Sequence, residues 1–296
     1  AQGNTDANGV GDFYYEPPSG YLALCTSNMD APSIKLPGDN FNTVLYTGNS
    51  SVGHAITGVG FQPDEVWMKR RDGGDQHIFY DAVRGVDYYL QSPDDGGNNT
   101  QTDGIAFDSD GFTLDDYPSY NQTGETYVAW NWKGDGVAGG TLNENGTLDS
   151  QVNVNTAAGF SIVKFTGNVT ANQTVGHGLS QAPELLILKR TGGTDDWRVG
   201  SDVMGWTGGE YLALNTTAAE ATNTSYWDTA PTATVFETSD SSSTNATDGM
   251  IVYCFHSVEG YSKVGSYEGN ANADGSFVYT GFRPAFLIIK NIDATA

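Results

Sequence analysis

The sequence TVLYTGNSSVGHAITGVGFQPDEVWMKRR, at residues 43–71, returns in altered form twice more along the chain. The second copy is SIVKFTGNVTANQTVGHGLSQAPELLILKRT at residues 161–191. The third copy is KVGSYEGNANADGSFVYTGFRPAFLIIKNID at residues 263–293. Each copy runs from an aromatic residue through Gly-Asn and a polar stretch to a proline, an apolar run and a lysine. Such regular recurrence indicates a repeated structural unit, and we call each copy a cassette.

Each cassette has the pattern of two short β-strands joined through a turn. We expect its Gly-Asn pair to form a turn in which glycine takes a positive φ. The proline, which lacks an N–H, fits the entrance of the second strand. The apolar run after it predicts a strand buried on both faces, although periodicity alone leaves a helix open. The lysine after that run is expected to mark the return to solvent, at Lys69, Lys189 and Lys290.

Composition favours the same class of fold. Of 296 residues 38 are glycine, 12% are aromatic and only 17% are charged, and no window shows a sustained helical stripe. Aromatic residues scattered among Gly, Asn, Thr and Ser are typical of many short strands joined by turns. We therefore predict an all-β protein built of tandem β-sandwich repeats.

The charge balance excludes two classes of partner. The net charge is −23, from 13 basic and 36 acidic residues. Binding to a nucleic-acid backbone needs clustered Lys and Arg, and anionic membrane surfaces attract basic segments. No apolar run is long enough to span a bilayer. We expect neither a nucleic-acid partner nor insertion into a membrane.

Four segments follow from the cassette spacing. Residues 1–32 lie outside the repeat and look like the closing segment of a different, preceding domain. Residues 33–140 and 141–257 form two units of roughly a hundred residues, each with enough short strands for a β-sandwich. Residues 258–296 form an incomplete third repeat. Because a lone hairpin is marginal in water, this part either continues in a longer chain or adds strands to the second unit or to a neighbouring subunit.

An aromatic strand closes each of the two full units, YVAWNW at residues 127–132 and MIVYCF at residues 250–255. In the first of these Val128, Trp130 and Trp132 share one face, which we place in the core.

Several phrases resemble a known group of proteins. FNTVLYTGN, FDSDGFTL, VAWNWKG and VYTGFRPA are similar to tandem β-repeat proteins of marine tailed phages, whose repeats follow a SPRY-type, concanavalin-like domain. The opening FYYEPPSGYLALCTSNM resembles the end of that domain, and residues 33–296 resemble the repeats. The resemblance implies jelly-roll or concanavalin-like sandwiches in a virion or extracellular protein, either a tail fibre, an appendage or a capsid decoration. Its partners would be copies of itself and other virion proteins, and it implies no catalytic residues.

Four aromatic residues of the second unit form a candidate site for host-surface glycans. Aromatic rings stack on sugar C–H groups, and Asp195, Asp196 and Arg198 stand near in sequence. The alternative is that these rings fill the core of the sandwich. The four candidates are Trp197, Trp206, Tyr211 and Trp227.

Other chemistry is sparse. Asp108 and Asp110, in Asp-Ser-Asp-Gly, have the alternation of a Ca²⁺ loop but also that of an ordinary turn. The four histidines lack metal-site spacing and are expected in turns or at the surface. Cys25 and Cys254 are expected to be free, with a disulfide between them as the alternative. Apart from Ca²⁺ we expect no cofactor.

Three functions remain in view. The first is a non-enzymatic virion surface protein that builds a rigid β-rich scaffold. The second is a carbohydrate-binding module of a depolymerase. The third is the subunit of an extracellular filament or surface layer.

Overall fold

The computed structural model describes residues 3–29 and 32–293. Its contacts divide the chain into two compact units, Ala1–Lys35 and Leu36–Ala296. The first unit is loop-rich: the carboxylate of buried Asp6 accepts hydrogen bonds from the backbone N–H groups of Asn8, Val10 and Ala23. Its described part contains one short 3-10 helix, Thr26–Asn28. The predicted boundaries after residues 32, 140 and 257 stay predictions.

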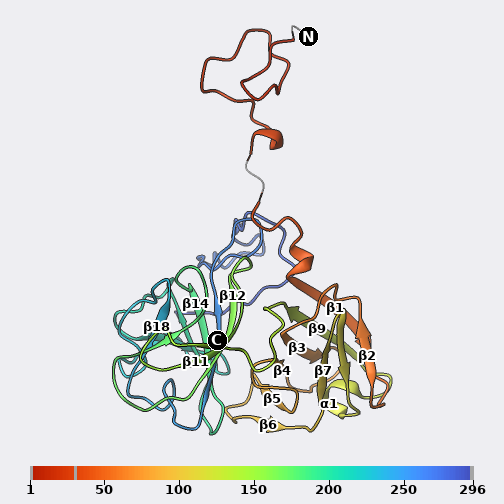
Figure 1. The fold of residues 1–296 in the computed structure, drawn as a ribbon, viewed down its shortest axis with the longest axis vertical. Helices are drawn as coiled ribbons and strands as arrows, with labels where there is room; N and C mark the ends of the chain where they lie inside the picture. The colour runs from red at the N-terminus through yellow and green to blue at the C-terminus, as the bar shows by residue number, and fades with distance from the viewer. Residues whose placement is uncertain (1–2, 30–31, 294–296) are drawn as a thin grey trace. The chain divides into compact units, whose positions relative to one another are not determined.

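The second unit contains two large antiparallel sheets (Figure 1). The first has the order β1-β9-β3-β4-β5-β6. Its strands are β1 (Phe41–Thr47), β3 (Glu65–Arg70), β4 (Ile78–Asp81), β5 (Tyr88–Gln91), β6 (Asn99–Thr100) and β9 (Thr126–Trp132).

The second large sheet has the order β10-β11-β12-β19-β14-β15-β16-β17. From β12 onward this order matches that of the first sheet, strand for strand. Its strands are β10 (Thr141–Asn143), β11 (Ser150–Asn155), β12 (Phe160–Phe165), β14 (Leu185–Arg190), β15 (Arg198–Ser201), β16 (Glu210–Ala213), β17 (Ala221–Thr222) and β19 (Met250–Phe255).

A small sheet accompanies each large one, in the orders β2-β8-β7 and β13-β18. The all-β class is thereby confirmed. Helical structure in the described part of this unit is limited to a 3-10 turn, Pro37–Asp39, and the short helix α1, Pro118–Asn121, and no described helix could cross a membrane. The small-sheet strands are β2 (His54–Thr57), β7 (Ile105–Asp108), β8 (Gly111–Leu114), β13 (Gln173–Gly176) and β18 (Val235–Thr238).

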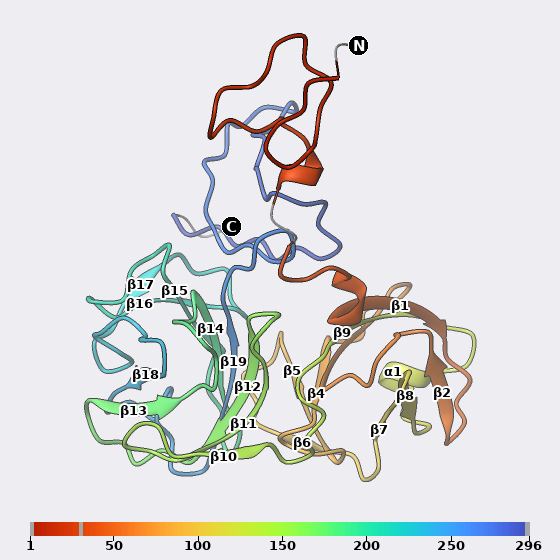
Figure 2. The ribbon, with the colours of Figure 1, turned by 45° about the horizontal axis from the view of Figure 1, so that its top comes forward.

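The four sheets bury three hydrophobic cores. One core lies between the first large sheet and its small sheet, and a second lies between the second large sheet and its small sheet. A third, which we call the inter-sheet core, joins the two large sheets face to face and includes Trp67, Phe79, Ile187 and Tyr253. Figure 2 shows the two large sheets facing each other. The order of layers is therefore small, large, large, small.

Strand alternation explains how one strand serves two cores. In β9, Tyr127 and Ala129 are fully buried against the small sheet, whereas Trp132 points into the inter-sheet core. The predicted face of Val128, Trp130 and Trp132 is thus the inter-sheet face. Val128 and Trp130 are only half-buried there.

The cassette glycines act through close approach rather than through a positive φ, which corrects the expectation from sequence. Positive φ falls two residues later, at Ser50 and Val169. A Cβ on Gly48 would lie 2.3 Å from the backbone oxygen of Gln122, and a Cβ on Gly167 would lie 2.2 Å from a backbone carbon of Asn245. No side chain fits between these segments.

A buried asparagine clamps each of these turns. Asn121 accepts a hydrogen bond from the backbone N of Asn49 at 2.9 Å and donates its side-chain amide to the carbonyl of Ser51. Asn245 repeats both contacts with Asn168 and Thr170, at 2.9 and 3.0 Å. Each clamp stands five residues before its closing strand, β9 or β19.

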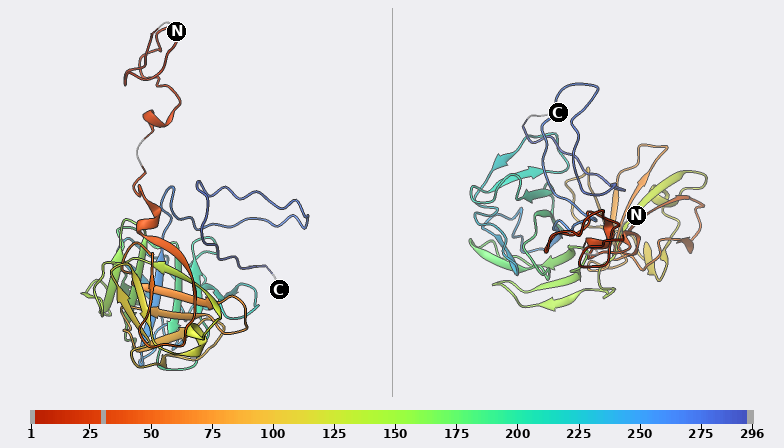
Figure 3. Two further views of the ribbon diagram at one scale, coloured as in Figure 1. Left: turned by 90° about the vertical axis from the view of Figure 1, so that its right-hand side faces the viewer. Right: turned by 90° about the horizontal axis from the view of Figure 1, so that it is seen from above.

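The third cassette forms no strand. After β19, the described residues to Asp293 contain one isolated bridge, Val258↔Ser262, and are otherwise loops (blue in Figure 3). This segment therefore lacks the pairing that orders the other two cassettes.

Replacing Gly48 or Gly167 by alanine is expected to destabilise the second unit. The new methyl group would overlap backbone atoms that cannot move alone, so we expect a loss above about 2 kcal/mol in chemical denaturation. Gly74→Ala is the matched control, because no atom lies within 4 Å of a Cβ there. It should change the free energy of unfolding by less than about 0.5 kcal/mol. Equal effects of the three changes would contradict the close-approach explanation.

Candidate functional site

A cavity of about 720 Å³ opens beside the inter-sheet core. Its walls come from both large sheets and from the third cassette. They are mostly apolar, with Trp67, Trp132, Phe160, Ile187 and Phe286 among the lining residues. A space of this size and polarity suits apolar side chains or an apolar ligand.

Phe286 of the third cassette packs against the inter-sheet core at this cavity. Its ring lies 5.6 Å from that of Trp67, 5.4 Å from Trp130 and 5.3 Å from Trp132, centroid to centroid. Aromatic rings at such separations attract one another beyond the effect of area burial. The third cassette is therefore attached to the sheets by this aromatic contact and by two hydrogen bonds, from Lys290 Nζ to the carbonyl of Thr216 at 2.6 Å and from the backbone N–H of Glu220 to the carbonyl of Ile292 at 2.9 Å. It forms no strand ladder with them.

One carboxyl group at the cavity has an oxygen without a hydrogen-bond partner. Glu65, the first residue of β3, is 2% exposed, and its Oε2 has no hydrogen-bond partner among the described residues. Burial raises the pKa of Glu65 well above its ordinary value. The charge of Asp81 raises it further, and Arg84 opposes them. A neutral acid is the favoured form, because an unpaired ion is costly in such surroundings.

A buried polar tie joins the two large sheets next to Glu65. Arg84 Nε donates to Asp81 Oδ2 at 2.5 Å, and the hydroxyl of Tyr253, from the opposite sheet, donates to the same oxygen at 2.8 Å. Arg84 also donates to the carbonyl of Phe79 at 3.0 Å. The buried charges are thus paired, and the Tyr253 hydroxyl is committed to structure.

A second buried polar contact is made by Lys189, the lysine of the second cassette. Its burial corrects the expectation that the cassette lysine marks the return to solvent. Lys189 is fully buried, and its Nζ donates to the carbonyls of Asp95 and Asp195 at 2.8 and 2.7 Å. Burial lowers the pKa of Lys189 to about 8. Lys69 is half-buried and donates to the carbonyl of Arg70 at 2.7 Å.

Three of the four predicted glycan residues lie in the cores, which corrects the site expected from the sequence. Trp197, Trp206 and Trp227 are all buried. Trp197 and Trp227 donate their indole N–H groups to the carbonyls of Gln91 and Glu210, both at 3.1 Å. Tyr211 is half-buried against Trp206 and Trp227, whereas Trp197 belongs to the inter-sheet core. The three buried indole rings have no free face to offer a sugar.

Asp108 and Asp110 make the contacts of a turn. Asp110 accepts the backbone N–H groups of Gly58 and Gly60 at 3.2 and 2.7 Å, and Asp108 accepts the hydroxyl of Thr113 at 2.6 Å. Among the described residues, no three Asp, Glu, His or Cys side chains are grouped as metal ligands. Ca²⁺ binding at this turn stays a prediction.

Histidine and cysteine side chains are dispersed. His177 and His256 are buried, against the expectation of surface histidines. His177 accepts the backbone N–H of Leu179 at 3.1 Å, and His256 contacts Gln181 at 2.6 Å. Cys25 and Cys254 are free thiols, and burial raises the pKa of Cys254 to about 12.

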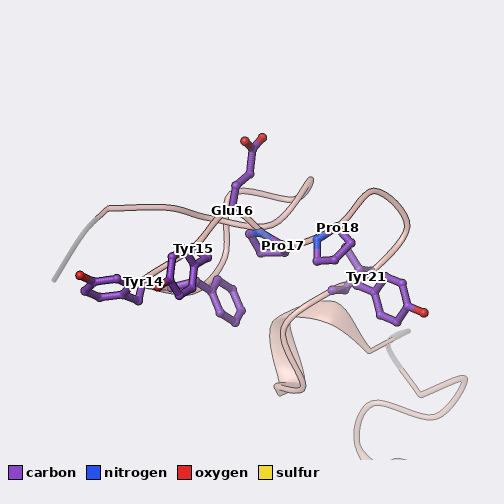
Figure 4. A pocket seen from close by; sticks show the side chains of 8 residues that line it. Tyr14, Tyr15, Glu16, Pro17, Pro18 and Tyr21 are labelled. Atoms are coloured by element: carbon purple, nitrogen blue, oxygen red, sulfur yellow. The ribbon is translucent and has the colours of Figure 1, made fainter.

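Exposed aromatic residues occur in the first unit instead. Tyr14, Tyr15 and Tyr21 line a shallow pocket with Pro17 and Pro18, and their rings are well exposed (Figure 4). The side chain of Glu16 points away from these rings in Figure 4. The signal in the sequence is the run of tyrosines around the two prolines, within the segment expected to close a preceding domain.

Comparison with known protein families identifies a family for the second unit. The family model described as a domain of unknown function, DUF7483, matches residues 36–296, which is the whole second unit. Searches among curated proteins and among solved structures gave no match.

Glu65→Leu is expected to stabilise the protein at neutral pH. The folded-state pKa of Glu65 is raised, so the buried acid lowers the free energy of unfolding only above about pH 4.5. This loss grows as the pH rises towards the folded-state pKa. Leucine, the residue at the equivalent position 185, should add about 1–3 kcal/mol at pH 7 and less at pH 4. Denaturant titrations at both pH values measure this.

The reciprocal change Leu185→Glu is the control and should destabilise most at high pH. A Glu65→Leu gain that is independent of pH would contradict the account of a buried, unpaired acid.

Proposed function

The chain belongs to the DUF7483 family. From the resemblance of its cassettes to phage β-repeats, we propose that it is a non-enzymatic structural protein of a phage virion surface. In this role it builds a rigid β-rich scaffold in a tail fibre, an appendage or a capsid decoration. Its partners are copies of itself and other virion proteins. Host-surface glycans are a further class of partner, and contact with them would fall to exposed residues such as the tyrosines of the first unit.

One observation supports an assembly role most strongly. The third cassette exposes large apolar side chains, including Phe277, Tyr279 and Ile289, and its exposed Leu287 lines the open cavity. Contiguous apolar surface is typical of a site that another segment or protein covers. The two large sheets are held together by the buried Asp81–Arg84 ion pair with Tyr253 and by the inter-sheet core, which suit a passive scaffold.

The polar groups near the cavity support a non-enzymatic role. The Ser201 hydroxyl donates to the carbonyl of Glu184 at 2.9 Å, and the Tyr253 hydroxyl donates to Asp81. Glu65 is not hydrogen-bonded to any nucleophile among the described residues. A catalytic site needs a nucleophile and a base in contact, or carboxylates in a paired geometry.

Localisation on particles tests this proposal. Gold-labelled antibodies against the chain, applied to purified virions, should decorate one repeated surface structure, and mass spectrometry should find the chain in stoichiometric amount. A preparation of particles depleted of the tail or appendage is the control. Particles that carry neither label nor peptide would contradict the proposal, and so would hydrolysis of a host glycan by the purified chain.

A further inference from the structure

The third cassette exposes side chains that the other two bury. Val66 and Met68 of β3 are 0% and 1% exposed, and their equivalents in β14 are as deeply buried. Leu287 and Ile289, at the same positions of the third cassette, are each 65% exposed. The sequence of the third cassette is therefore that of a core strand, but its surroundings are incomplete.

The two complete cassettes show which strand the third cassette lacks. In the first, β9 lies between β1 and β3 and pairs with both, over seven and six residue pairs. In the second, β19 lies between β12 and β14 and pairs with each over six. In the third cassette, residues 263–268 and 286–290 correspond to the two flanking strands. No strand lies between them in the described chain.

The turn of the third cassette has the same local geometry as the turns of the other two. In every cassette the asparagine of the Gly-Asn pair accepts a hydrogen bond from the backbone N–H two residues on, at 2.9, 3.0 and 3.1 Å. The residue between them has the same unusual backbone, with φ of 52°, 53° and 50° at Ser50, Val169 and Ala271. What the third turn lacks is the clamping asparagine.

Gly269 lies in open space, unlike the equivalent glycines of the other two cassettes. Gly48 and Gly167 are pressed against the segment that carries the clamp, whereas no atom lies within 4 Å of a Cβ on Gly269. A close approach is what requires glycine at this place in the other cassettes. At Gly269 nothing in the described structure requires it.

We propose that the third cassette is an acceptor for one antiparallel β-strand of the β9 and β19 type, presented by a partner segment. Such a strand carries alternating apolar side chains and has an asparagine five residues before its first residue. The strand would pair with residues 263–268 on one edge and 286–290 on the other. Its asparagine would accept a hydrogen bond from the backbone N of Asn270. This deepens the proposed function and rests on its assembly role.

The cavity fits this occupant. Alternate residues of the complete central strands, Trp132 in β9 and Ile251 and Tyr253 in β19, point into the inter-sheet core. An added strand in the third cassette would direct its own alternate side chains into the same region, where the cavity of about 720 Å³ is partly lined by the third cassette. Apolar burial and backbone pairing would then favour binding together.

A synthetic peptide of residues 119–133, fluorescently labelled, tests the proposal against the intact chain. We expect saturable binding by fluorescence anisotropy. The same peptide with Asn121→Ala should bind about tenfold more weakly, because two hydrogen bonds to the cassette turn are lost. Equal binding of both peptides, or no binding of either, would overturn the proposal.

Gly269→Ala in the protein separates this interaction from folding. Because the site is open, the change should leave the melting temperature unaltered, but its methyl group should block the clamp and abolish peptide binding. Gly275→Ala, also in open space, is the matched control and should bind normally. Undiminished binding by Gly269→Ala would overturn the proposal, and so would a dimer of the chain that excludes the peptide. If the peptide does not bind, the localisation of the chain on virions still tests the proposed function separately.

Discussion

The structure of the second unit depends on a central strand that is hydrogen-bonded along both edges to the two strands of a cassette. β9 joins β1 to β3, and β19 joins β12 to β14. The cassette strands lie close together in sequence, whereas the central strand arrives more than fifty residues later. Closure of each sheet is therefore a non-local event, and such contacts are expected to form late in folding.

The same strand also couples the layers. Its alternate side chains enter two different cores, so displacement of β9 would disturb both the small sheet and the opposite large sheet. The polar tie between Asp81, Arg84 and Tyr253 lies across the inter-sheet core. Buried ion pairs contribute little net stability, but removal of one partner is costly. We regard this tie as a device that fixes how the two large sheets face each other.

Much of the fold could be predicted from local sequence. Strand class, the cassette turns and the aromatic closing strands follow from alternation and turn residues. The role of Gly48 could not be predicted, because the backbone that crowds it lies over seventy residues away. The same holds for Trp197, which packs against β4 and β5 of the other sheet, and for Lys189, which is bonded to the loop after β5. Glu65 did leave a signal: it is an acid where the other cassettes have Leu185 and Phe286.

This account makes the doubly paired central strand the most stable element and the third cassette the least protected. Native-state hydrogen exchange followed by mass spectrometry measures both in one experiment. We predict that the amides of β9 and β19 exchange slowest and that those of residues 263–268 and 286–290 exchange fast. Protection of residues 286–290 as strong as that of β3 would contradict the account.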